Sequence, residues 1–184
     1  SFGAVRLGPL SFGDFDEAEE TGWGFRGSFR WIGERRAEDY PELAGLPDVD
    51  ASLEVGGGLS YAQPWWEAFA VARYGVIGHE SLVAEVGMDL IARPVDRLSL
   101  RLGPRLFWGS DGYARTYFGV EEPAGAFAAF AAEGGLLSSG LAASADYALG
   151  GPWSLTAEVR YDRLQADAAA SPISAEDDQW SASV

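Results

Sequence analysis

The chain has 184 residues, of which 47% are hydrophobic and 24 are glycine, and its formal net charge is −15. This length fits one domain, and the aromatic content of 13% is not that of a disordered chain. The absence of cysteine excludes disulfides, cysteine-based metal sites and a cysteine nucleophile. All 13 basic residues are arginine, and the acidic balance argues against nucleic acid as a partner, because phosphate binding requires a basic surface.

The dominant pattern is an alternation of apolar and polar residues with a period of two, which is typical of β-strands. Between residues 22 and 32, for example, aromatic side chains at odd positions alternate with small or charged side chains at even positions. The pattern predicts nine strands, at residues 2–9, 22–32, 51–62, 67–76, 82–92, 98–108, 136–148, 153–164 and 179–184.

The connections between these strands alternate in length. Residues 63–65, 93–97 and 150–152 are short connections, whereas 33–50, 109–135 and 165–178 are long. Only the links 10–21 and 77–81 depart from this order. Short turns at one rim and long loops at the other are typical of outer-membrane barrels, in which the short turns are periplasmic.

No segment has the roughly 18 apolar residues of a transmembrane helix, since the longest, Ala124–Ala132, has half that length. Crossing a bilayer therefore requires a closed barrel, the other structure that satisfies its backbone hydrogen bonds in lipid. The sequence thus predicts an all-β protein, an antiparallel up-and-down transmembrane β-barrel in the bacterial outer membrane, with residues 1–184 forming one domain.

Charged residues on the polar faces of the strands balance one another, because six arginines accompany six acids. We expect them to face the interior and to pair there, since an unpaired charge in a low-dielectric wall is costly. They are Arg26, Arg30, Glu54, Arg73, Glu85, Asp89, Arg101, Arg105, Asp146, Glu158, Arg160 and Asp162. The net negative charge then belongs to the connections and strand ends.

Tryptophan residues lie near the ends of the predicted strands, where interfacial aromatic girdles are expected. They are Trp23, Trp31, Trp66, Trp108, Trp153 and Trp180, with Trp65 beside Trp66. A soluble lipocalin-like barrel or a β-sandwich would also alternate, but would place its apolar face inside. The tryptophan positions and the alternating loop lengths favour lipid on the outside.

From Leu98 onward the chain resembles the MipA/OmpV family of outer-membrane proteins. The segments that carry the resemblance are Leu-Gly-Pro-Arg-Leu (102–106), Tyr-Ala-Arg-Thr-Tyr-Phe-Gly-Val (113–120), Trp-Ser-Leu-Thr (153–156) and Asp-Ala-Ala-Ala-Ser-Pro-Ile (167–173). Upstream, Leu-Ala-Gly-Leu (43–46) and Asp-Val-Asp-Ala (48–51) resemble the long loop and next strand of the family. The resemblance extends over essentially the whole chain.

The resemblance implies a barrel with strands before Ser1 and a last strand that closes with an aromatic residue beyond Val184. Strand parity agrees, because a periplasmic N-terminus and C-terminus require an even number of strands. We therefore expect the nine strands to belong to a barrel of ten or twelve.

The only histidine, His79, lies in the predicted 77–81 link and is the first candidate for a catalytic residue. A Ser-His-acid site needs a base within hydrogen-bond reach of its nucleophile and an orienting carboxylate. A solvated loop histidine is the favoured interpretation, and structural salt bridges are favoured over an acid-base pair among the interior carboxylates. We expect no catalytic residue and no enzyme activity.

Acidic clusters at Glu17 with Glu19-Glu20, at Asp48 with Asp50, and at 176–178 lack the spacing of a calcium-binding loop and favour ordinary solvated loops, so no metal or cofactor is expected. The Gly-Gly-Gly run at 56–58 lies within a strand and indicates close packing or bulging. The Ala-rich run 124–133 is expected to form a short helix over the barrel mouth or within the lumen.

Two functions remain open. The resemblance implies a non-enzymatic scaffold that contacts a murein lytic transglycosylase, and a murein synthase, in the periplasm, or a surface or adhesion protein that uses its long loops. The alternative is a small channel or uptake pore with a lumen lined by the charged rows. A barrel of ten to twelve strands leaves little free bore, because side chains already fill one of about eight.

Overall fold

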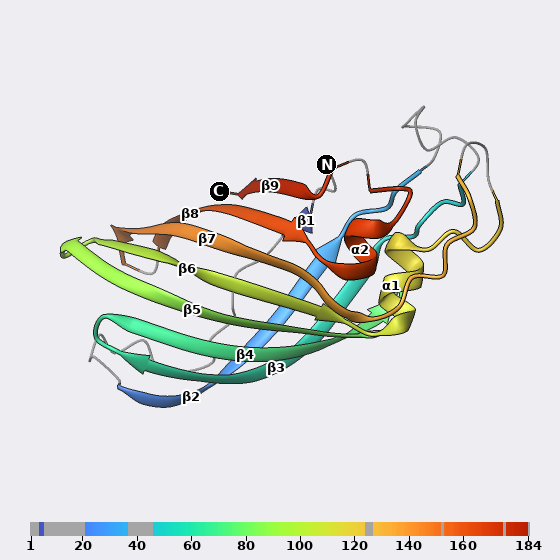
Figure 1. The fold of residues 1–184 in the computed structure, drawn as a ribbon. Helices are drawn as coiled ribbons and strands as arrows, with labels where there is room; N and C mark the ends of the chain where they lie inside the picture. Colours follow the sequence, from blue (N-terminus) through green and yellow to red (C-terminus); the bar gives the residue numbers. More distant parts are fainter. Residues whose placement is uncertain are drawn as a thin grey trace.

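The computed structural model of the chain describes residues 4–5, 21–36, 46–123, 127–151, 153–174 and 176–183. Figure 1 shows one curled sheet with two short helices at one end. The strands are β1 (Ala4–Val5), β2 (Gly22–Ile32), β3 (Ser52–Gln63), β4 (Trp66–Ile77), β5 (Leu82–Val95), β6 (Leu98–Gly109), β7 (Gly135–Gly150), β8 (Trp153–Leu164) and β9 (Asp178–Ser183). The helices are α1 (Asp111–Phe118) and α2 (Ala166–Ala170).

The nine strands form a single antiparallel sheet in which each strand pairs with its neighbours in sequence, from β1 to β9. The predicted up-and-down all-β fold is therefore confirmed, and the strand boundaries agree to within a few residues. Of the first predicted strand, 2–9, only Ala4–Val5 belongs to the described residues. Within the described residues, the ladders do not join β9 to β1, so the paired sheet is not closed.

The sheet is strongly curved, because side chains from distant strands meet across its concave face. Arg160 on β8 bonds Glu85 on β5, three strands away, at 2.7 Å. Arg30 on β2 lies over the ring of Phe107 on β6, four strands away, at 5.1 Å. Strands lie about 4.8 Å apart in a sheet, so a flat sheet would hold these pairs too far apart to touch. The concave face therefore forms an interior in which side chains of distant strands contact one another.

Burial follows the alternation in the opposite sense to that of a soluble sheet. On β5, Val86 and Leu90 are about half exposed on the convex face, whereas Glu85 and Asp89 are buried on the concave face. Most of the other strands continue this arrangement, although a few apolar side chains, such as Phe69 and Phe107, also lie inside. Among the described residues no helix is long and apolar enough to cross a membrane.

The hydrophobic core lies at the end of the sheet that carries α1, where long connections converge, and not halfway along the strands. Strand ends contribute part of it, and α1, α2 and two loops contribute the rest. Its buried members are Ile32, Val49, Val83, Phe107, Tyr113, Ala114, Tyr117, Ala132, Leu137, Leu164 and Ala168. This core closes the end of the sheet from which the long loops emerge (Figure 1).

The predicted helix in the run 124–133 is wrong for its described part, residues 127–133, which are not helical. Val120 and Phe130 instead form an antiparallel bridge with backbone bonds of 2.9 and 2.8 Å, and Ala132 enters the core. Residues 124–126 lie outside the described residues. The helix over this end is α1, which begins after Ser110 and buries Tyr113, Ala114 and Tyr117 on one face.

Candidate functional site: a paired-charge interior beneath a capped mouth

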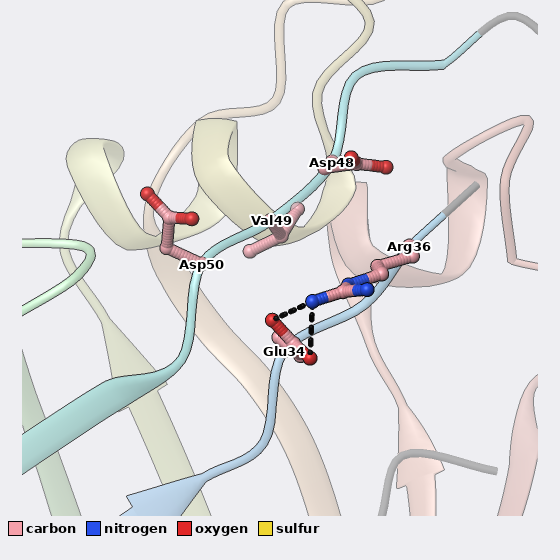
Figure 2. A pocket seen from close by; sticks show the side chains of 5 residues that line it. All are labelled: Glu34, Arg36, Asp48, Val49 and Asp50. Carbon is pink, nitrogen blue, oxygen red and sulfur yellow. Dashed lines mark hydrogen bonds and ion pairs between the residues drawn. The ribbon is translucent and has the colours of Figure 1, made fainter. Parts of the chain in front are cut away.

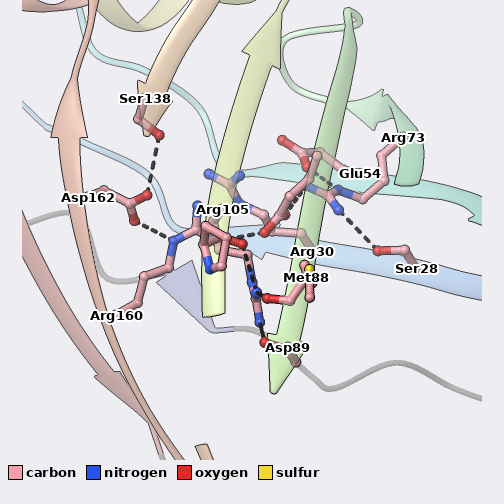
Figure 3. A network of polar contacts seen from close by, with 12 residues as sticks. Ser28, Arg30, Glu54, Arg73, Met88, Asp89, Arg105, Ser138, Arg160 and Asp162 are labelled. Carbon is pink, nitrogen blue, oxygen red and sulfur yellow. Dashed lines mark hydrogen bonds and ion pairs between the residues drawn. The ribbon is translucent and has the colours of Figure 1, made fainter. Parts of the chain in front are cut away.

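All twelve charged residues that the sequence assigns to the interior are buried or half-buried in the structure. Figure 3 shows the network in which several of them meet. Arg73 bonds Glu54 at 2.9 Å and Glu85 at 3.2 Å, so one guanidinium joins β3, β4 and β5. Arg160 binds the second oxygen of Glu85 at 2.7 Å and also pairs with Asp162 on its own strand. We call this set, Glu54, Arg73, Glu85, Arg160 and Asp162, the interior network.

Burial makes the interior network different from a surface ion-pair cluster. Glu54 has no exposed side-chain area, and the side chains of Arg73 and Arg160 are 4% and 3% exposed. Charges removed from water in this way are tolerated only when hydrogen bonds satisfy them. The additional bonds from Arg73 to Ser28 and from Ser138 to Asp162 supply part of that satisfaction. With these two bonds the network connects six strands through their inner faces, namely β2, β3, β4, β5, β7 and β8.

A second layer lies further from α1. Arg105 bonds Asp89 at 2.7 Å. The ring of Phe69, on the inner face of β4, has the guanidinium carbon of Arg26 at 4.4 Å from its centroid and that of Arg105 at 5.1 Å. Such contacts between cations and an aromatic ring are favourable when partly desolvated. The interior is thus filled by stacked charged and aromatic side chains at this level.

Glu67 is not among the predicted interior residues, but in the structure it joins two of the predicted arginines. Glu67 on β4 binds Arg26 on β2 at 3.2 Å and Arg101 on β6 at 2.8 Å. Asp146 lies 4.0 Å from Arg101 and accepts a bond from Thr156. The parity of β4 could have identified Glu67, because it shares odd numbering with Arg73, but Phe69 and Val71 between them obscured the pattern.

Arg30 and Glu158 complete the set of twelve. Arg30 donates to the hydroxyl of Tyr113 at 3.3 Å and lies over the ring of Phe107. Glu158 is half-buried on the inner face of β8, two residues before Arg160. A small interior hollow of about 100 Å³ is lined by side chains that include Arg30, Arg160 and Asp162.

His79 is not a solvated loop residue, and that expectation is wrong. Its side chain is fully buried, with Nε2 3.3 Å from Glu54. The backbone N–H of Ser81 donates to Nδ1 at 3.1 Å, so the neutral ring carries its proton on Nε2 and donates to Glu54. Gly75 provides the space, because a Cβ there would lie 2.5 Å from the imidazole. Both ring nitrogens are engaged, which leaves neither as a base.

Helix α1 covers His79 and seals this end of the interior. The rings of Tyr113 and Tyr117 meet the imidazole edge to face, with centroids 5.0 and 5.8 Å away. Tyr117 also donates to the hydroxyl oxygen of Ser52 on β3 at 2.9 Å. Burial raises the pKa of the Tyr113 phenol, and burial raises the pKa of Tyr117 to about 12. The helix is therefore fixed by hydrogen bonds to β2 and β3 as well as by apolar packing.

The raised pKa of Tyr117 predicts a loss of stability in alkali. An ordinary phenol ionises near pH 10, so the unfolded state ionises first, and the neutral folded phenol contributes stability that is full below pH 10. That contribution is lost as the pH rises from about 10 to about 12. We expect urea midpoints of the wild type to fall across this range and those of Tyr117→Phe to fall less. Equal decreases in the two proteins would contradict the assignment.

The tryptophans assigned to the interfaces lie on the convex face of the sheet. Trp66 is half-buried, and the other five are exposed, from 40% for Trp31 and Trp108 to 77% for Trp23. Rings of Trp23, Tyr61 and Trp66 contact one another across β2, β3 and β4, with centroids 5.3 and 5.7 Å apart. Aromatic contact across strands stabilises a sheet locally. Each of these rings is apolar but carries one polar group, an indole N–H or a phenol hydroxyl, and lies on the outer face near the end of its strand.

The acidic cluster at Asp48 and Asp50 borders an open hollow of about 310 Å³ in the long-loop end (Figure 2). Glu34 and Arg36 line it too and pair with each other at 3.0 Å, while both side chains remain half exposed. Among the described residues, no group of three or more potential ligand side chains could hold a metal ion. The cluster Glu17 with Glu19-Glu20 lies outside the described residues.

The arrangement as a whole is structural in its chemistry, since its buried acids bind arginines and its one histidine is enclosed. A search of curated proteins and a search of solved structures each found no match. The family described as MltA-interacting protein MipA matches residues 5–184, nearly the entire chain. The predicted resemblance is thereby confirmed, and the chain belongs to the MltA-interacting protein MipA family.

Proposed function

We propose that this protein is a non-enzymatic outer-membrane β-barrel that serves as a scaffold for murein-remodelling enzymes. The observation that carries the proposal is the filled interior, in which layers of ion pairs lie beneath a capped mouth in a chain of the MltA-interacting family. The name of the family supports a murein lytic transglycosylase as partner, and a murein synthase would be a second.

The distribution of polarity supports the location in the outer membrane. The convex face carries exposed leucine, valine and aromatic side chains along most strands, and the buried arginines and acids are on the concave face. In water this surface would be an aggregation hazard, whereas in lipid it is the required one. A midplane arginine on the lipid face would cost about 2–4 kcal/mol. Closure of the sheet would satisfy its edge strands.

The packing of the interior favours a scaffold function and argues against a channel function. The hollow lined by Arg30, Arg160 and Asp162 has a volume of only about 100 Å³. Arg73, Arg105 and the aromatic ring of Phe69 occupy the space between the strands at successive levels. Moving solute through would require separation of buried ion pairs, which is costly.

We therefore expect the complete refolded protein to give no steady conductance in a planar lipid bilayer. A sixteen-stranded porin in the same bilayer is the positive control. Steady conductance whose ion preference changes with Arg101→Glu would establish the channel and refute the filled-interior argument.

The scaffold role itself is tested by binding. The complete protein in lipid nanodiscs should capture a purified MltA-type lytic transglycosylase, and nanodiscs with an unrelated outer-membrane barrel should not. Absence of saturable binding to this enzyme would refute the proposal.

A further inference from the structure

The end of the sheet opposite α1 is formed by tight turns, which Figure 1 shows away from both helices. Pro64–Trp65 connects β3 to β4, and Asp96–Arg97 connects β5 to β6. Trp65 at the first turn is 61% exposed, and Arg93 and Arg97, beside and within the second, are also exposed. We call Trp65, Arg93 and Arg97 the turn patch.

Hydrogen bonds hold the turn patch in one arrangement. The guanidinium of Arg93 donates to the carbonyl of Pro64 at 2.8 Å, which ties the second turn to the first. The carbonyl of Trp65 accepts the N–H of Ile91, and the carbonyl of Arg97 accepts the N–H of Ala148, both at 2.8 Å. A surface fixed in this way loses little conformational entropy when a partner binds. The backbone of the patch and the Arg93 side chain are therefore preorganised.

The row of aromatic residues on the outer face does not account for Trp65. Trp66 belongs to that row, because it pairs with Gln63 and Leu90 in the ladders and contacts Tyr61 on the convex face. Trp65 precedes the strand, in the turn itself, and its ring meets that of Trp66 edge to face at 6.1 Å. An exposed tryptophan at the tip of a turn is available to a partner outside the bilayer.

The positive charge of the patch indicates which kind of partner surface would bind it. Its turns carry Arg93 and Arg97 against one acid, Asp96, in a chain whose net charge is −15. In the part of the chain that the structure describes, the turn at the end of β7 contains Gly150 and Gly151, with positive φ of 110° and 58°, and these two residues carry no side chain. A complementary surface would offer an apolar pocket for an indole, with carboxylates beside it.

We propose that the turn patch is the docking surface for the lytic transglycosylase, through an apolar pocket bordered by acids on that enzyme. The proposal rests on the scaffold function. Short turns of outer-membrane barrels face the periplasm, so a periplasmic enzyme reaches this rim and not the one capped by α1. Tryptophan and arginine are also the residue types enriched among binding hot spots.

The test measures binding of the purified MltA-type transglycosylase to the complete protein in nanodiscs of phosphatidylethanolamine and phosphatidylglycerol. Trp65→Ala should weaken the affinity at least about 30-fold, as expected of a hot-spot tryptophan. Arg97→Glu should slow association about tenfold, and the effect should shrink at high salt. Trp153→Ala is the matched control, because Trp153 is a tryptophan at the same rim, 72% exposed against 61% for Trp65, but belongs to the row on the outer face. Arg115→Ala, on α1, controls for loss of an exposed arginine at the other end.

The possible results distinguish failure of the docking proposal from failure of the scaffold function on which it rests. If the wild type does not bind, the scaffold function fails. If it binds and Trp65→Ala and Trp153→Ala bind equally well, the scaffold function stands and the turn patch is overturned. A change in thermal unfolding in nanodiscs with unchanged enzyme affinity would make Trp65 a lipid-headgroup anchor, which also overturns the docking proposal. Heat-modifiable mobility on gels confirms that each variant is folded.

Discussion

Replacement of Arg73 by alanine is expected to lower the free energy of unfolding by about 3–5 kcal/mol, the cost of breaking a buried ion pair by removing one partner. The substitution takes a guanidinium from both Glu54 and Glu85, whose carboxylates stay buried on the inner face. It also removes the bond to Ser28, which is one of the contacts between β4 and β2. Urea unfolding in micelles, followed by tryptophan fluorescence, measures the change.

Arg101→Ala is the matched control for this experiment. Arg101 also binds an interior carboxylate, that of Glu67 at 2.8 Å, but its side chain is 31% exposed. Water can solvate the remaining charges there, and a partly exposed pair contributes about 1 kcal/mol or less. Equal losses for the two variants would show that burial does not set the value of these pairs.

Gly58→Ala is expected to destabilise the sheet by about 3 kcal/mol or more, through overpacking against backbone that cannot move aside. A Cβ at Gly58 would lie 1.9 Å from the carbonyl oxygen of Ala70 and 2.6 Å from the Cα of Val71. Both atoms belong to β4, which pairs with β3 through this segment. Relief would require β3 and β4 to separate where the sheet bends, so the yield of refolded protein should fall together with the urea midpoint.

The adjacent Gly57→Ala substitution provides the comparison. Its Cβ would project to the other face of β3, where the nearest atom is the carbonyl oxygen of Arg26 at 3.1 Å. A shift of a few tenths of an ångström relieves this contact, so we expect a change within about 1 kcal/mol. A loss as large as that of Gly58→Ala would mean that helix and strand propensity, rather than the close approach of β4, explains the glycine run.

Much of the fold could be predicted from local sequence, because the side-chain period of a strand is local. Wherever apolar and polar residues alternated, as between Glu85 and Leu90, the strand and its two faces followed. Close packing at the glycine run is confirmed by the approach of β4 to Gly56 and Gly58. The β4 segment was harder to interpret, since Phe69 and Val71 share the inner face with Arg73, and this concealed Glu67.

The packing of α1 and the loops over one end of the sheet could not be predicted from local sequence patterns. Helix α1 has eight residues, of which only three are buried. A helical repeat of apolar residues cannot be recognised over so short a segment. The Ala-rich run appeared to be the better helix former, yet its backbone bonds to Val120 and its Ala132 fills the core. His79 looked like a loop residue because the residues that bury it, Tyr113 and Tyr117, lie more than thirty positions away.

The sequence by itself determined the strands, their up-and-down order, the polarity of their faces and the family of the chain. Only the tertiary structure decided which charges pair, that Glu67 bridges two arginines, and that α1 closes the mouth over a buried histidine. The physical reason is the curvature of the sheet. Alternation depends on neighbours in the chain, whereas the partners of an inner side chain depend on how far the sheet curls to bring distant strands together.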